Sequence, residues 1–156
     1  MMGSDIGVIA PYAAQISLLE RLLRGNEAYR KQVEGLLGPL RAMQVGQVEV
    51  KTVDGFEGRE KEVIIFSTVR NNAQGHIGFL ADRRRMNVGL TRARRGLFVV
   101  GSVWTLRREG GVGAERGGRG ADERSVWVRY VDWMRENGAV KVLKGETLAR
   151  MLLGRV

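Results

Sequence analysis

The apolar residues of this chain follow two kinds of pattern, which alternate along its length. Short runs rich in Val and Ile, or alternating with polar residues, are typical of strands. They predict strands at residues 5–10, 47–53, 63–69, 97–102 and 139–143. Apolar residues three and four apart predict helices at residues 12–24, Glu27–Leu37, 123–137 and 146–153, with a further helix within residues 78–96. Pro11, Gly25, Gly38 and Gly138 fall at the expected helix boundaries.

Strands that alternate with helices argue for an α/β fold with a mostly parallel sheet flanked by helices. The run at residues 63–69 is apolar almost throughout, as expected of a central strand that is buried on both faces. Ligands of such sheets bind beyond the carboxyl ends of the strands. We therefore expect three loops to meet there: the loop after Ala10, residues 54–60, and the loop that carries the helix of residues 78–96.

One domain, residues 1–156, is the expected organisation, because 156 residues of which 44% are apolar can form a single core. Residues 107–122 are rich in glycine and charge and show no apolar periodicity. We expect this segment to be a flexible surface loop inserted in the domain, not a linker between two domains.

Residues 78–96 stand out through their charge, with six arginines within thirteen residues. Three apolar residues of this stretch recur at the spacing of one helix face, namely Met86, Leu90 and Ala93. The pattern predicts a basic helix with one buried side. Arg85 and Arg92 are seven residues apart, which would place them on nearly the same line of that helix, about 20° from one another. Arginines so placed are candidates to contact an anionic ligand.

The formal net charge of +9 favours a polyanionic partner, since phosphate backbones attract clustered Lys and Arg. The chain has no cysteine, which excludes disulfides and thiolate metal sites, and its single histidine, His76, cannot hold a metal alone. We therefore expect no metal site. No apolar run approaches the roughly 18 residues that cross a bilayer, and the first residues lack the pattern of a signal peptide. These features predict an intracellular protein without a membrane partner.

Three stretches of the sequence resemble motifs IV, V and VI of the superfamily 1B helicases, the group of the nonsense-mediated-decay helicase and senataxin. They are IGVIAPYAAQ from Ile6, VKTVDGFEGREKEVIIFSTVRNN from Val50, and GFLADRRRMNVGLTRARRGLFVVGS from Gly78. Their order and spacing over residues 6–102 match the family, and the helix with Trp127 resembles its closing helix. The run FSTVR and the phrase GFL are most similar to the senataxin-like branch. The resemblance implies the second RecA-like domain of a P-loop NTPase helicase.

The resemblance also implies an ATP site that this domain completes together with a first RecA-like domain. Arg92, in TRAR, would be the arginine finger that reaches the γ-phosphate, and such a finger is worth about 10³ to 10⁵ in rate. Gly58, Glu60 and Arg85 match positions close to the nucleotide. The residues alone also allow Arg92 to be a surface charge and Arg85 to pair with a neighbouring carboxylate. A plain turn-rich loop is the alternative for Gly58 and Glu60.

Four further positions match the part of the family that approaches the nucleic acid, namely Tyr12, Gln15, Thr52 and Asp54. The resemblance implies that the hydroxyl of Thr52 donates to a phosphate and that Asp54 couples the nucleotide to the strand. The alternatives are a threonine chosen for its strand propensity, an aspartate that forms its own turn, and a tyrosine in the buried stripe of its helix. Glu57 stands where the family most often has glutamine, so that contact does not carry over.

The sequence contains no phosphate-binding loop, no acidic Walker B strand and no QYRM-like segment. ATP with Mg²⁺ would therefore be bound mainly by the first RecA-like domain, and we expect the chain alone to be inactive as an ATPase. The implied partners are that domain and single-stranded RNA or DNA, for a monomeric protein with a nuclear location favoured over a cytoplasmic one. The alternative is a non-catalytic basic module that keeps the RecA-like fold and binds nucleic acid or a partner protein. A helicase of the replication or decay type, outside the senataxin-like branch, shares the same motifs.

Overall fold

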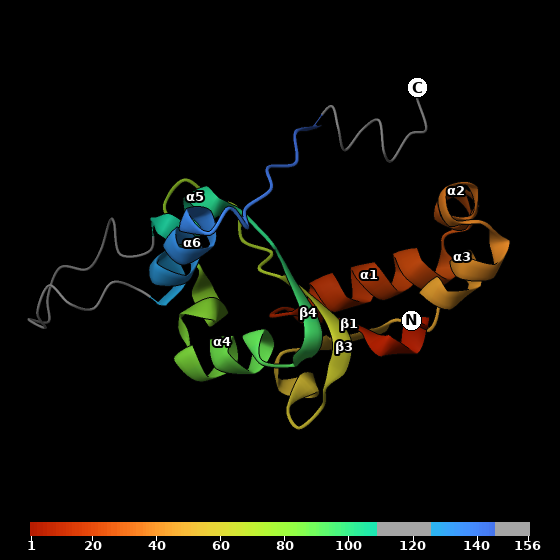
Figure 1. The fold of residues 1–156 in the computed structure, drawn as a ribbon, viewed down its shortest axis with the longest axis horizontal. Coiled ribbons are helices and arrows are strands. Elements are labelled where there is room, and N and C mark those ends of the chain that lie inside the picture. The colour runs from red at the N-terminus through yellow and green to blue at the C-terminus, as the bar shows by residue number, and fades with distance from the viewer. Residues whose placement is uncertain (109–125, 146–156) are drawn as a thin grey trace, which may run out of the picture.

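A computed structural model describes residues 1–108 and 126–145 of the chain. Its centre is a parallel sheet with the strand order β2-β1-β3-β4. The strands are β1 (Ile6–Ala10), β2 (Glu49–Thr52), β3 (Lys61–Ser67) and β4 (Ala93–Val100). Helices lie on both faces of this sheet (Figure 1). The predicted α/β fold with a parallel sheet flanked by helices is confirmed.

The connections between the strands carry the helices. Between β1 and β2 the chain forms α1 (Ala13–Gly25), α2 (Glu27–Leu37) and α3 (Pro39–Val45). Short 3-10 turns occur at η1 (Gly3–Asp5), η2 (Asp54–Phe56) and η3 (Gly78–Ala81). Helix α4 (Arg83–Leu90) joins β3 to β4, and α5 (Val103–Arg107) and α6 (Val126–Glu136) follow β4. The sheet is therefore built from crossovers, as its parallel strands require.

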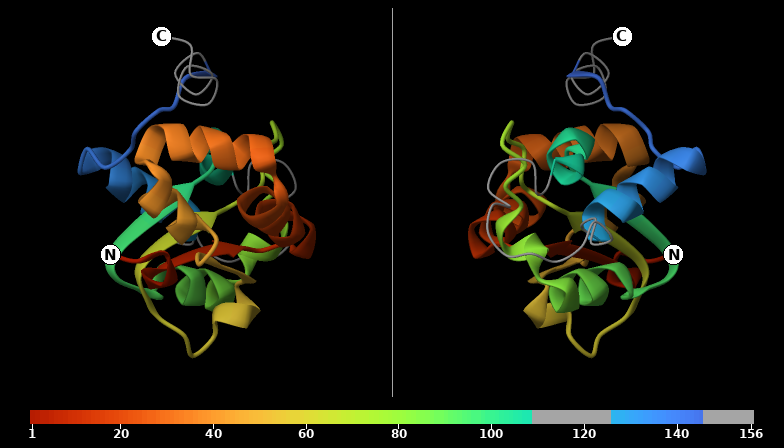
Figure 2. Two further views of the ribbon diagram at one scale, coloured as in Figure 1. Left: turned by 90° about the vertical axis from the view of Figure 1, so that its right-hand side faces the viewer. Right: turned by 90° about the vertical axis from the view of Figure 1, so that its left-hand side faces the viewer.

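The two faces of the sheet bury separate apolar clusters. On one face, Phe66 of β3 stacks on Trp127 of α6 with ring centroids 6.0 Å apart, and α4 and α5 close the same cluster. The indole Nε1 of Trp127 donates a hydrogen bond to the main-chain oxygen of Leu80 at 2.8 Å. On the other face, α1 packs on β1 and β2 around Val8 and Val50. Figure 2 shows α1 and α4 on opposite sides of the sheet.

The most apolar strand is central, as predicted for residues 63–69. Strand β3 pairs with β1 on one side and with β4 on the other. Its Ile64 and Phe66 are fully buried, while Ile65 packs against the α1 face. A strand covered on both faces and paired on both sides can carry an almost continuous apolar run.

The basic helix is shorter than predicted, and this changes the position of Arg92. Helix α4 ends at Leu90, and Ala93 is already the first residue of β4. The amide of Lys61 donates to the carbonyl oxygen of Arg92 at 3.0 Å, so pairing with β3 begins here and overrides the helical spacing of the sequence. The prediction that Arg85 and Arg92 share one helical line is wrong.

Other local predictions also differ from the structure. Residues 139–143 form no strand, although they run beside β4. Helices α3 and α5 were not expected from the periodicity, because each is shorter than the window in which a helical repeat can be recognised. The glycine-rich segment lies outside the described residues from residue 109 onward, and so does the helix expected at residues 146–153.

Candidate nucleotide and nucleic-acid interface

Helix α4 runs beside the sheet and carries the arginines of the third motif. Its N-cap is Asp82, whose carboxylate accepts from the amides of Arg84 at 2.8 Å and Arg85 at 3.4 Å. The buried side of the helix lies on β3, where a Cβ at Gly89 would come within 2.6 Å of the Phe66 ring. A glycine at this position lets the helix approach the strand closely, and the distance between α4 and the sheet is therefore fixed by packing.

Arg92 lies just beyond the C-terminus of α4 and is held against it. Its Nε donates to the main-chain oxygen of Val88 at 3.1 Å, and its Nη2 donates to the hydroxyl of Thr91 at 2.8 Å. That hydroxyl in turn donates to the main-chain oxygen of Asn87 at 2.7 Å. The carbonyl groups at a helix C-terminus carry partial negative charge, so they orient a guanidinium that sits there.

Glu60 lies close to Arg92 along the sheet, at the edge where β3 and β4 begin. We call this the amino edge, defined by Lys61 and Ala93, which are paired at the start of the two strands. Glu60 accepts a hydrogen bond from Nε of Arg94 at 3.0 Å. This bond, followed by the charge of Glu60, raises the pKa of the Arg94 guanidinium above its ordinary value.

Gly58 adopts a left-handed conformation in the loop that leads to the amino edge. Its φ is 71°, and a Cβ at this position would meet no atom within 4 Å. Glycine is therefore favoured here by the backbone conformation and not by crowding. The open space leaves the main chain of this loop accessible to a ligand.

Asp54 and Arg85 meet at the opposite edge of the sheet. The carboxylate of Asp54 accepts from Nε and Nη2 of Arg85 at 3.2 and 3.4 Å. Asp54 follows β2 directly, in a turn where the hydroxyl of Thr52 accepts from the amide of Gly55 at 3.2 Å. The ion pair that the sequence allowed for Arg85 is thus present, and the hydroxyl of Thr52 is engaged in the turn that carries Asp54.

Tyr12 and Gln15 lie at the carboxyl edge, defined by Ala10 and Thr52, which are paired at the ends of β1 and β2. The hydroxyl of Tyr12 accepts a hydrogen bond from Nε of Arg70 at 2.7 Å. Gln15 lines an open groove of about 600 Å³. The groove is also lined by Ser67 at the end of β3, by Val69, Arg70 and Asn71 after it, by residues 99–103, and by residues 140–143.

The predicted site residues therefore fall into two groups. Tyr12, Asp54 and Arg85 lie near the carboxyl edge, whereas Glu60 and Arg92 lie near the amino edge. The three expected loops do meet at the carboxyl edge, where Phe79 contacts Tyr12 and Arg85 pairs with Asp54. Glu60 and Arg92 do not lie there, because each directly precedes a strand and so falls at the amino edge. Helix α4 runs antiparallel to the strands, so its two ends lie at opposite edges of the sheet.

The residues that contact these groups include some that sequence reasoning missed. Thr91 holds Arg92, and Arg70 and Phe79 contact Tyr12. An arginine directly after the central strand was the available signal for Arg70. Within the described residues no group of three acidic or histidine side chains could hold a metal ion. Likewise, none of the helices of that part of the chain is long and apolar enough to cross a membrane.

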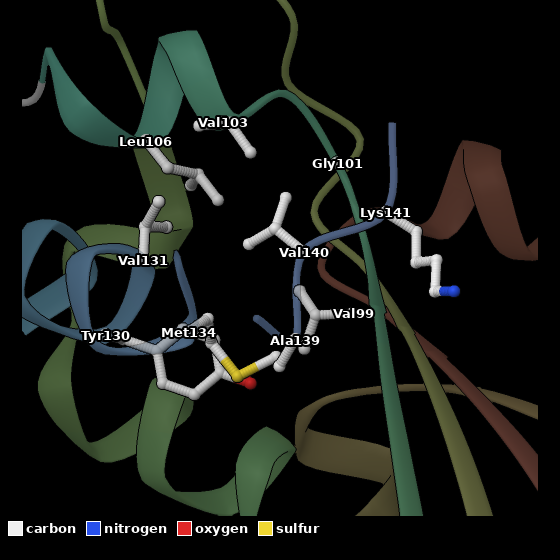
Figure 3. A pocket seen from close by; sticks show the side chains of 10 residues that line it. All are labelled: Val99, Gly101, Val103, Leu106, Tyr130, Val131, Met134, Ala139, Val140 and Lys141. Atoms are coloured by element: carbon white, nitrogen blue, oxygen red, sulfur yellow. The ribbon is translucent and has the colours of Figure 1, made fainter. Parts of the chain in front are cut away.

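A smaller apolar pocket lies between β4, α5 and α6 (Figure 3). Its volume is about 100 Å³, which is small for a nucleotide site. Met134, Val131 and Val140 point into it, and Lys141 points away in Figure 3. Burial raises the pKa of the Tyr130 hydroxyl at its rim. This pocket shares Val99, Gly101, Val103, Val140 and Lys141 with the groove at the carboxyl edge and therefore adjoins that groove.

Comparison with known proteins identifies the class. The profile of a family described as AAA domain matches residues 2–103. The DNA polymerase alpha-associated DNA helicase A of Saccharomyces cerevisiae is 43% identical over 107 residues, which cover 69% of this chain and 13% of that protein. The regulator of nonsense transcripts 1 homolog of Neurospora crassa is 41% identical over 103 residues, which cover 66% of this chain and 8% of that protein. The DNA-binding protein SMUBP-2 of Rattus norvegicus is 41% identical over 100 residues, which cover 64% of this chain and 8% of that protein.

The chain belongs to this AAA domain family. More narrowly, it is a member of the superfamily 1B helicases, as the three motifs implied. It spans only about a tenth of the length of the curated relatives that it matches.

Proposed function

We propose that this chain is the C-terminal RecA-like half of an ATP-dependent RNA or DNA helicase, in which it supplies the arginine finger and part of the nucleic-acid groove. The observation that carries the proposal is the geometry of Arg92. Its guanidinium is fixed by Val88 and Thr91, while its Nη1 has no hydrogen-bond partner within residues 1–108 and 126–145. A guanidinium that is fixed by two hydrogen bonds and keeps further N–H donors unused can stabilise the negative charge on a phosphoryl group during its transfer.

The remaining nucleotide contacts are proposed for the loop that precedes β3. Gly58 offers accessible main chain and Glu60 offers a carboxylate at the amino edge, near Arg92. The main chain at Gly58 suits the phosphates of ATP, and the carboxylate of Glu60 suits the hydroxyl groups of its sugar. The Mg²⁺ ion is not accommodated here, because the described residues contain no group of three side chains that could hold a metal ion. ATP with Mg²⁺ would be held mainly by the first RecA-like domain, and hydrolysis would belong to the whole enzyme.

The nucleic acid is proposed to bind along the carboxyl edge. Gln15 lines the groove there, and Tyr12 contacts Arg70 of the same groove. Thr52 ends the neighbouring strand β2, and Asp54 lies in the turn after it. Arg85 joins this edge to the finger, because it pairs with Asp54 and lies on the helix whose end holds Arg92. Single-stranded RNA and DNA are both consistent with these contacts.

The finger is tested by Arg92→Ala and Arg92→Lys in the intact helicase. We expect the kcat of ATP hydrolysis to fall about 10³- to 10⁵-fold for Arg92→Ala, with binding of ATP retained. Arg92→Lys should remain impaired, since an ammonium cannot reproduce the planar fork of a guanidinium. Arg95→Ala is the matched control, because Arg95 is 82% exposed and pairs with Glu62. Normal turnover of Arg92→Ala would rule out the finger.

A non-catalytic basic module is the second candidate, and the net charge of +9 favours it. Such a module would bind single strands with an affinity that falls steeply with salt and does not respond to ATP or to an added first domain. The proposed helicase half should instead gain ATPase activity when combined with the first domain and show negligible activity alone. Measuring ATPase activity and strand binding with and without that domain separates the two candidates.

A further inference from the structure

Tyr12, Arg70 and Phe79 form a cluster at the carboxyl edge, and the motif resemblance gives a role only to Tyr12. The guanidinium of Arg70 lies 4.8 Å from the ring centroid of Tyr12 and donates to its hydroxyl. Phe79 of η3 meets the same ring edge to face, with centroids 5.5 Å apart. The guanidinium of Arg85 lies over the ring of Phe79, 5.0 Å from the ring centroid. Two adjacent aromatic rings thus lie between two guanidinium groups along this edge.

The backbone that presents Arg70 is strained. Val69 has a φ of 64°, a conformation that a β-branched residue rarely adopts. The amide of Arg70 donates to the carbonyl oxygen of Thr68 at 2.7 Å, which closes a tight turn centred on Val69. Thr68 itself is buried, and its hydroxyl has no hydrogen-bond partner in the part of the chain that the structure describes. Local strain of this kind is characteristic of functional sites, and here it directs Arg70 back over Tyr12.

Phe79 is placed with similar specificity. Gly78 has a φ of 57°, and a Cβ on it would come within 2.6 Å of the Tyr12 hydroxyl. The glycine therefore lets the turn approach Tyr12 so that Phe79 reaches its ring. Yet 52% of Phe79 remains exposed, a large area for an aromatic side chain that the backbone holds in a fixed place. An exposed, fixed ring is what a stacking partner requires.

We propose that Phe79, together with Arg70 and Tyr12, is a stacking platform for the bases of a single-stranded nucleic acid. Bases stack on aromatic rings and guanidinium planes without regard to sequence, and the phosphates are attracted by the same arginines. The arginines next to Phe79, including Arg83 and Arg84 in the first turn of α4, outnumber the nearby acids Asp54 and Asp82. This inference rests on the proposed function and assigns Phe79 and Arg70 to its nucleic-acid groove.

The test measures binding of the chain Met1–Val156 to a labelled oligothymidylate and to an abasic oligomer of equal length. Phe79→Ala should weaken binding of the oligothymidylate about 5- to 150-fold, the range for loss of one stacked base, and leave binding of the abasic oligomer unchanged. Phe79→Trp should bind at least as well as the wild type. Phe98→Ala is the matched control, because Phe98 is a 61% exposed phenylalanine on β4. Circular dichroism melts establish that each variant is folded.

Several results would overturn the platform while leaving the arginine finger to be judged by its own ATPase test. Equal loss for both oligomers would mean that Phe79→Ala acts through charge or folding and not through stacking. Unchanged binding of both oligomers, with weaker association of the first RecA-like domain, would make Phe79 a protein contact. Absence of any binding by the wild-type chain would also exclude the platform. An ATPase test that rules out only the arginine finger would not affect the platform.

Discussion

The guanidinium of Arg92 is anchored to the last turn of the preceding helix, because its Nε donates to the main-chain oxygen of Val88 at 3.1 Å. The direction of this side chain is therefore determined by where α4 ends. The hydroxyl of Thr91 adds a second bond to Nη2 at 2.8 Å and is itself fixed by Asn87. Thr91 is thus a positioning residue for the proposed finger.

Thr91→Ala should lower the kcat of ATP hydrolysis by the intact helicase about 5-fold, the equivalent of one hydrogen bond of roughly 1 kcal/mol. The KM for ATP should change little, since the hydroxyl holds the finger and is not proposed to bind substrate. Thr91→Ser keeps the hydroxyl and should restore most of the rate. A merely structural role would instead lower the thermal stability of both variants without this separation of kcat from KM.

Asp54→Ala should have little effect on stability, because its ion pair with Arg85 is largely solvated. The side chains are 68% and 35% exposed, and pairs of this kind contribute about 0–1 kcal/mol. A double-mutant cycle with Arg85→Ala, measured by urea unfolding, should give a coupling free energy within that range. A coupling of about 3 kcal/mol, as found for buried pairs, would contradict this prediction.

Gly89→Ala should destabilise the fold by about 1–3 kcal/mol, because the added methyl group would collide with the Phe66 ring between α4 and β3. Gly35→Ala is the matched control, since Gly35 lies in helix α2 and a Cβ there would meet nothing within 4 Å. That substitution should stabilise the protein by about 0.5–1 kcal/mol. Thermal unfolding of both variants checks the opposite signs, and a neutral Gly89→Ala would show that α4 is not closely packed on the sheet.

Glu49 should make stability dependent on pH in the acidic range. The hydrogen bond from Lys61 at 3.0 Å, followed by the charges of Lys61 and Arg59, lowers the pKa of this carboxyl below its ordinary value. A lowered folded-state pKa contributes stability above the unfolded pKa of about 4.3, and this contribution is lost as the pH falls through the folded value. The stability difference between wild type and Glu49→Gln should therefore shrink below about pH 4.3.

Urea unfolding at a series of pH values measures that difference. Glu27→Gln is the control, because Glu27 pairs with Lys31 while both side chains are more than two-thirds exposed, at 71% and 72%. Its effect on stability should stay small at every pH. A difference for Glu49→Gln that grows as the pH falls would have the wrong sign and would refute the assignment.

The sequence by itself determined the class of fold and the family. Short β-branched runs and helical repeats reflect which side of a strand or helix is buried. The spacing of apolar residues along the chain shows this directly, because it is a local property. The apolar run around Phe66 thus predicted the central strand, and helix α2 (Glu27–Leu37) was predicted with the bounds that it has. The motif around Arg92 predicted which arginine to examine, because a functional residue type at a fixed spacing is visible without coordinates.

Only the tertiary structure decided how those residues are arranged. The bond between Arg70 and Tyr12 joins residues 58 positions apart, and no local pattern encodes such a contact. Arg92 lies outside the helix predicted for it, because pairing with Lys61 on β3 starts a strand there. Strand pairing is a long-range interaction, and here it outweighs a weak helical propensity. The same pairing places Arg92 at the amino edge, just beyond the C-terminus of α4, while Arg85 lies in the first turn of that helix at the carboxyl edge.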